Sequence, residues 1–126
     1  MAPGSTMVSV AAGPLVAPVL RRVVGMLAAR ADLPLDRLDD AVLVADLIAA
    51  RAPGHMRGPT VDVSLQSAER SLILRVGPLE PGGGNALVTE AAVPGVGNLI
   101  EHLADSLEVA PAEDGEALVV HLSYAA

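Results

Sequence analysis

The sequence predicts an α+β fold, a two-layer sandwich in which a mixed or antiparallel sheet of four to five strands carries three helices on one face. Apolar residues recur at helical spacing in the first half of the chain and alternate with polar residues through much of the second half. Breakers such as Gly13-Pro14 and Gly77-Pro78 separate these segments. Because amphipathic helices and half-buried strands each need an apolar cover, packing one kind of element on the other satisfies both.

The first residues predict a lead followed by a strand. Residues 1–6 lack the basic start and apolar run of a secretory signal, so we expect a disordered lead or a cloning remnant there. Residues 7–11 are a short run with β-branched side chains, typical of an edge strand. Residues 7–126 are expected to form a single domain, since a chain of 126 residues that is 52% hydrophobic can bury its own core.

Two amphipathic helices are expected after this strand. The first begins near residues 14–16 and places Val16, Leu20 and Leu27 on one face. Pro34, with carboxylates directly after it, suits the first turn of a second helix, because proline tolerates that turn and acids favour its dipole. The second helix is expected to end near residue 52, before a Pro-Gly breaker.

The second half predicts two hairpins. Apolar and polar residues alternate over residues 61–65 and again over residues 72–76, with a turn between the two runs. A last hairpin is expected from residues 107–110 and 117–124, around Glu113-Asp114-Gly115.

A loop and a third helix are expected between these hairpins. Residues 80–85, Glu-Pro-Gly-Gly-Gly-Asn, predict a mobile loop without regular structure. Pro94 is expected to open the third helix, in which Val96, Leu99, Ile100 and Leu103 share a face. The sheet face away from the helices is expected to include Ile73, Val109 and Val119, and a contiguous apolar patch there would mark a partner site.

Charge and composition exclude several classes of protein. Eight arginines against 15 acidic residues give a net charge of -7, which disfavours binding to nucleic acid. The longest strongly apolar stretch, residues 41–50, is interrupted by Asp46 and is shorter than the ~20 residues of a membrane span, so we expect no membrane partner and a cytoplasmic protein. Without cysteine, and without a His-x-x-x-His pair, no disulfide or metal site is expected.

Three segments together resemble a known family. They are residues 33–40 at the start of the second helix, Gly77-Pro78 after the middle hairpin, and residues 93–100 followed by Leu103-Ala104-Asp105. With the predicted order of elements, they make the chain similar to the anti-sigma-factor serine kinases of the histidine-kinase-like ATPase superfamily, the GHKL group built on the Bergerat fold. The resemblance covers nearly the whole chain and implies that fold for residues 7–126.

The resemblance also implies where a catalytic pair would lie. The family's catalytic helix carries Glu-x-x-x-Asn, whose carboxylate acts as general base and whose amide oxygen ligates magnesium. The matching residues are Asp46 and Ala50. Alanine has no oxygen to offer a metal, so Asp46 is the one remnant catalytic candidate. Asp46 could instead pair with an arginine, such as Arg75, or face solvent.

The nucleotide-binding glycine boxes also lack residues that the family uses to bind ATP. The family's Asp-x-Gly-x-Gly, whose Asp accepts a hydrogen bond from adenine, corresponds to residues 75–79. Arg75 stands at the Asp position and has no acceptor, while Gly77 is kept. Gly95 and Gly97 match the family's glycine-rich turn, and a turn or tight packing explains them better than anion binding.

These departures predict a regulatory protein that resembles an anti-sigma factor, acts in transcription regulation by protein–protein binding, and has a degenerate ATP site without kinase activity. Ala50, Arg75, Gly77, Gly95 and Gly97 are then vestigial positions, and no cofactor is expected. The expected partner is a sigma factor or an anti-anti-sigma regulator, with a homodimer also open. The alternative is an ATP-binding serine/threonine kinase anti-sigma factor that holds ATP and magnesium with non-standard residues.

Overall fold

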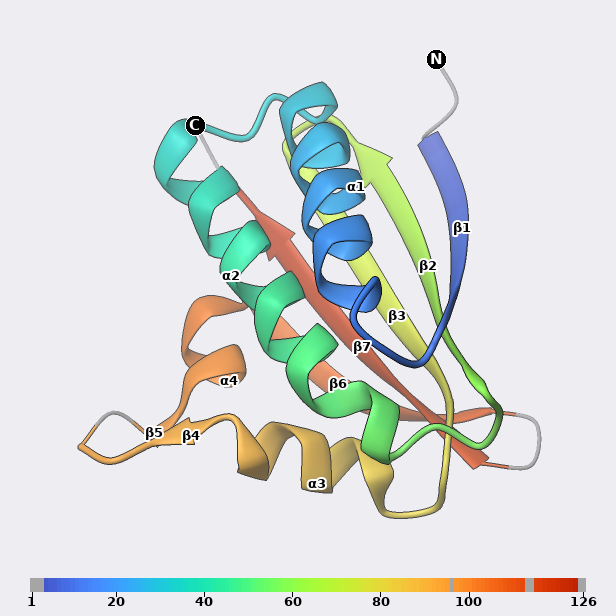
Figure 1. Cartoon of the computed structure of the whole chain (residues 1–126). Coiled ribbons are helices and arrows are strands. Elements are labelled where there is room, and N and C mark those ends of the chain that lie inside the picture. The colour runs from blue at the N-terminus through green and yellow to red at the C-terminus, as the bar shows by residue number, and fades with distance from the viewer. Residues whose placement is uncertain (1–3, 96, 113–114, 125–126) are drawn as a thin grey trace.

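The computed structural model describes residues 4–95, 97–112 and 115–124, which form a main sheet, a layer of helices and a small two-stranded sheet (Figure 1). In chain order the elements are β1 (Gly4–Ala11), α1 (Val16–Arg30), α2 (Leu35–Arg51), a 3-10 turn (Ala52–Gly54), β2 (Thr60–Ala68), β3 (Ser71–Leu79), α3 (Gly83–Glu90), β4 (Ala92–Val93), β5 (Gly97–Asn98), α4 (Leu99–Leu103), β6 (Ser106–Ala112) and β7 (Gly115–Ser123).

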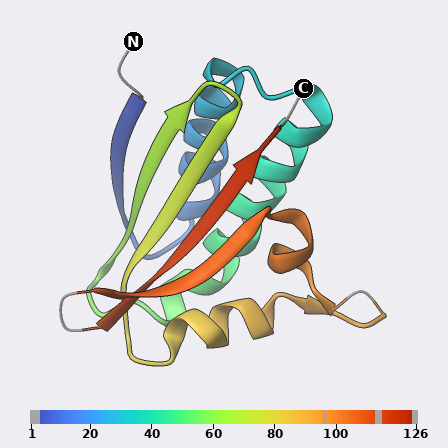
Figure 2. The same ribbon diagram turned by 180° about the vertical axis from the view of Figure 1, so that it is seen from behind.

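The main sheet has five strands in the order β1-β2-β3-β7-β6, and every neighbouring pair is antiparallel. Helices α1 and α2 lie side by side across one face of this sheet, and the view from behind shows the other face uncovered (Figures 1 and 2). The predicted α+β fold class, the antiparallel sheet and both hairpins are therefore confirmed, and β1 is an edge strand as expected.

The core lies between the sheet and the first two helices. Alternate residues of each strand point toward the helices, so one cross-strand row contains Leu65, Leu74 and Val120, all at most 1% exposed. Burying each such leucine or valine stabilises the fold by ~1.5–3 kcal/mol. The helices contribute the facing layer, with Leu20, Val24, Leu27, Val44 and Ile48 all buried. These residues recur at three- and four-residue intervals, which is why a helix fits the sequence here.

The prediction that residues 1–6 are a disordered lead is wrong for residues 4–6. Strand β1 begins at Gly4, and Gly4, Ser5 and Thr6 pair with residues 65–67 of β2. Pairing with residues 60–67 of β2 extends the strand beyond the β-branched run that the sequence displays. Residues 1–3 lie outside the described part of the chain.

The loop expected at residues 80–85 is also wrong, because α3 begins inside it at Gly83. The helix buries Leu87 completely, and this burial outweighs the low helix propensity of the glycines. Gly84 is buried close to Val109 of β6: a Cβ atom at Gly84 would lie 2.9 Å from the Val109 side chain. The two glycines therefore allow the helix to approach the sheet closely.

The third helix does not begin at Pro94. Instead β4 and β5 form a small hairpin, and the helix is the five-residue α4. Gly95 and Gly97 have φ angles of 83° and 90°, in the left-handed region that an α-helix does not use. Ile100 is buried and Leu103 partly buried, as the predicted apolar face requires. Residues 96, 113 and 114 lie outside the described residues.

Within the described ranges, the helices are too short or too polar to cross a membrane.

Candidate functional site

Asp46 lies on the solvent-facing side of the helix layer and pairs with Arg21 of α1. Arg21 donates from Nη2 to Oδ2 at 2.7 Å and from Nε to Oδ1 at 3.2 Å. The hydrogen bond with Asp46, and then its charge, raise the pKa of the Arg21 guanidinium. The contact between Asp46 and Arg75 suggested by the sequence is therefore wrong. Ala50, one turn further along α2, is exposed.

Arg75 lies on the opposite side of the molecule. Its neighbours Leu74 and Val76 point into the core, so Arg75 projects from the uncovered face of the sheet, beside Ser64 and Val119 on the adjacent strands. The buried core layer thus separates Arg75 from the side of α2 that carries Asp46.

Gly77 has a packing role where β3 approaches β7. A Cβ atom at Gly77 would lie 2.9 Å from the Cβ of Ala117 and 3.0 Å from the carbonyl oxygen of Glu116. The register between the two strands shifts at this point. Gly95 and Gly97 belong to the turn region of the β4–β5 hairpin. This hairpin follows the C-terminal end of α3, whereas the C-terminal end of α2 lies near the start of α3 (Figure 1). The positions that the family resemblance assigns to nucleotide do not meet in one site.

The uncovered sheet face is mainly polar. Ile73 and Val119 lie on it as diagonal neighbours on adjacent strands, because Ile73 pairs with His121 and Val119 pairs with Arg75. Val109 does not belong to this face, since it pairs with the buried Leu118 and contacts the α3 side. Small polar side chains predominate: Ser5, Ser9, Thr60, Ser64, Gln66, Ser71, Ser106 and Ser123. On the described part of this face, Ile73 and Val119 therefore lie together among mostly polar neighbours.

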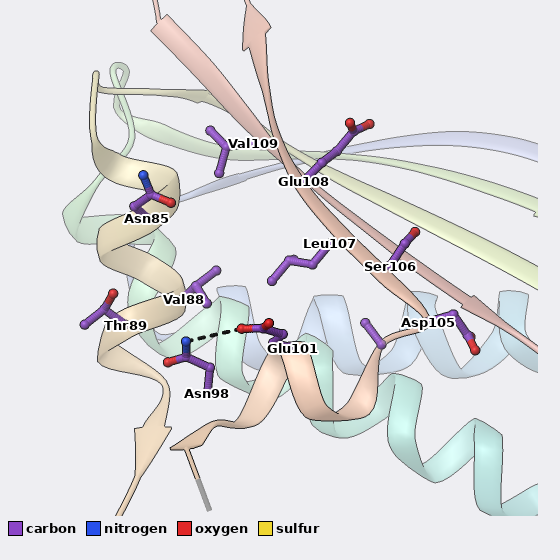
Figure 3. Close-up of a pocket in the computed structure, with 11 residues that line it drawn as sticks. Asn85, Val88, Thr89, Asn98, Glu101, Asp105, Ser106, Leu107, Glu108 and Val109 are labelled. Carbon is purple, nitrogen blue, oxygen red and sulfur yellow. Dashed lines mark hydrogen bonds between the residues drawn. The ribbon is translucent and has the colours of Figure 1, made fainter.

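A groove of about 620 Å³ lies on the helix side, between α3, α4 and the edge strand β6 (Figure 3). Val88 of α3 and Leu107 of β6 supply apolar walls, and Asn85 stands at one end. Asn98 donates from Nδ2 to Oε2 of Glu101 at 3.4 Å, which directs the Glu101 side chain into the space between the two helices.

The charge of this groove is negative. Glu101, Asp105 and Glu108 are among its lining residues, and none of the described residues that line it is an arginine or a histidine. Glu101 and Glu108 are exposed, and in Figure 3 Glu108 points away from the helices, on the far side of β6. The groove therefore repels phosphate groups and attracts cationic groups.

Asp105, at one end of the groove, is held by structural contacts. Its Oδ2 accepts a hydrogen bond from the backbone N–H of Ser123 at 2.6 Å and another from Arg37. Burial raises the pKa of Asp105, but the Ser123 N–H and the Arg37 guanidinium outweigh burial and hold that pKa below its usual value.

Arg37 joins two of the segments that carry the family resemblance. It donates from Nη1 to the carbonyl oxygen of Leu103 at 2.6 Å, from Nε to the carbonyl oxygen of Ser123 at 3.1 Å, and also to Asp40 and Asp105. We call these contacts the Arg37 clasp. Burial lowers the pKa of Arg37, but the hydrogen bonds that Arg37 donates to Asp105 and Asp40 raise it by more, so the net direction is upward. Residues 33–40 and 103–105 thus have a structural role that sequence reasoning missed.

Comparison of the chain with protein-family models and with curated proteins found no match. The membership in the anti-sigma kinase group stays a prediction from the sequence. Among the residues that the structure describes, no three His, Asp or Glu side chains gather closely enough to hold a metal ion.

Proposed function

We propose that this protein is a regulatory protein of the anti-sigma kind, which acts by binding another protein and does not phosphorylate it. The observation that carries this proposal is the separation of Asp46 and Arg75. Asp46 is engaged by Arg21 on the outside of the helix layer, and Arg75 projects from the far face of the sheet. A catalytic base and an adenine-binding group must face one nucleotide, and residues at these two positions do not.

The charge of the groove between α3, α4 and β6 supports the same proposal. A nucleoside triphosphate needs cations for its phosphate groups, and the groove lining offers carboxylates instead. A protein segment that carries arginine or lysine suits this lining better, since opposite charges steer partners together.

Strand β6 adds a second feature suited to a protein partner. It is the last strand of the sheet order, so one row of its backbone N–H and C=O groups has no neighbouring strand. Pro111 has no N–H, which leaves Ser106 to Ala110 as the part that can pair with an added strand.

The test is direct binding to the sigma factors and anti-anti-sigma proteins of the same organism, measured by biolayer interferometry with and without ATP and magnesium. We expect one of these proteins to bind equally well in both conditions, and no transfer of the γ-phosphate from radiolabelled ATP to it. ATP-dependent binding or phosphate transfer would support the alternative, an ATP-dependent serine kinase.

Charge-reversed variants locate the contact surface. Glu101→Lys is expected to weaken binding to that partner by about tenfold or more, because it replaces attraction by repulsion. Glu69→Lys, in the exposed β2–β3 turn, makes the same change of charge outside the groove and serves as the control. Equal weakening by both variants would show a general effect of net charge and not a groove contact.

A further inference from the structure

A second hollow, of about 440 Å³, opens on the uncovered face of the sheet near the end of β3. Its lining includes Met7, Arg57, Ser64, Arg75, Pro78 and Ala117, and it contains no described carboxylate. In a protein of net charge -7 with only eight arginines, two of them line this one hollow. Two like charges placed together repel each other unless an anion lies between them.

The backbones of both arginines are held by strand β3, Arg75 as part of the strand and Arg57 by a hydrogen bond to it. Arg75 belongs to β3, and the backbone N–H of Arg57 donates to the carbonyl oxygen of Pro78 at 3.1 Å. Met56 forms an isolated bridge with Leu79 one residue away, which holds the segment of Arg57 against the end of β3. The two side chains therefore enter the hollow from defined points.

Small residues form part of the lining of the hollow. Gly77 follows Arg75 on β3, and the close approach of Ala117 leaves no room for a side chain at Gly77. Ala112 and Ala117 complete this part of the lining. The hollow thus has two cationic groups and a floor of small or apolar groups.

We propose that this hollow is a binding site for a phosphate monoester. A phosphate monoester carries a charge of about -1.5 to -2 near neutral pH, which matches two guanidinium groups, whereas a carboxylate carries only one negative charge. Guanidinium groups donate paired hydrogen bonds to phosphate oxygens. Ser64 adds a hydroxyl group, and Met7 and Pro78 can contact the apolar part of the ester. The site does not depend on the function proposed above, because it lies on the other face of the sheet.

The experiment is an NMR titration of the ¹⁵N-labelled protein with phenyl phosphate, using benzoate as a probe with the same ring and a single charge. We expect saturable shifts of the Arg57, Ser64 and Gly77 amide signals in the millimolar range, and clearly weaker binding of benzoate. A capped peptide that contains phosphoserine distinguishes the two sources of the ester. Tighter binding of this peptide than of phenyl phosphate assigns the site to a phosphorylated partner residue, and equal binding assigns it to a small ester.

Matched variants decide whether the two arginines form the site. Arg57→Gln and Arg75→Gln should each weaken phenyl phosphate binding about tenfold, the loss expected for one charge-assisted contact. Arg22→Gln, at an exposed position of α1, changes the net charge equally and should change the affinity less than twofold. The proposal is overturned if phenyl phosphate causes no saturable shift, if benzoate binds as tightly, or if Arg22→Gln weakens binding as much as the other two variants.

Discussion

Replacing Arg37 by alanine removes the Arg37 clasp and should destabilise the fold by about 2–4 kcal/mol. The side chain is only 17% exposed, and two backbone carbonyl groups, those of Leu103 and Ser123, lose their donor. Each such loss costs ~1 kcal/mol. The carboxylates of Asp40 and Asp105 are 35% and 43% exposed, so each ion pair adds only ~0.2–1 kcal/mol.

Urea unfolding followed by circular dichroism measures this loss. Arg37→Lys is the informative companion, because lysine keeps the charge but cannot bond both carbonyl groups and both carboxylates with a planar fork. It should recover less than half of the lost stability. Arg22→Ala, at an exposed position, is the control and should change the free energy of unfolding by less than ~0.5 kcal/mol. If Arg37→Ala is as stable as this control, the clasp does not stabilise the fold and the reasoning is refuted.

Further predictions concern the other positions discussed above. Gly77→Ala should lower the free energy of unfolding by ~1–3 kcal/mol through overpacking against β7, and a urea midpoint equal to wild type would contradict this. The lowered pKa of Asp105 contributes stability that is present above pH ~4, its unfolded pKa, and is lost as the pH falls through the folded value, so Asp105→Asn should flatten the acid limb of urea stability measured between pH 5 and 2. Asp46→Asn should leave the urea midpoint nearly unchanged, because its ion pair is exposed. The double variant Ala50→Asn with Arg75→Asp should gain no ATP binding by calorimetry, since the structure places Arg75 on the far face of the sheet; a gain would contradict that placement.

The strongly periodic elements were predictable from sequence. The helical spacing of Val16, Leu20 and Leu27 and the alternation in both hairpins reflect burial on one face, and burial on one face decides these elements. α3 was not predictable, because its glycines have low helix propensity and the helix depends on the burial of Leu87 and on space near Val109. These contacts join segments distant in sequence.

The candidate site was predictable only as a set of separate positions. The family resemblance assigned Asp46 to the catalytic helix motif and Arg75 to the adenine-binding motif. No sequence pattern indicated that Arg21 would pair with Asp46, or that Arg75 would project from the opposite face of the sheet. Arg37 contacts Asp105 across 68 positions of sequence, and Arg57 comes to line the same hollow as Arg75 because Met56 forms a bridge with Leu79 at the end of β3. Such contacts are set by topology and strand register, which hydrophobic periodicity does not specify.

The central claim is that this protein binds a partner without using ATP. Isothermal titration of the unmodified protein with ATP and magnesium tests it most directly. Asp46 pairs with Arg21, Arg75 projects from the far face of the sheet, and the exposed Ala50 has no oxygen to offer a metal, so these positions do not form one nucleotide site. We predict no saturable heat at ATP concentrations below the millimolar range. Micromolar binding with a stoichiometry of one would contradict the account.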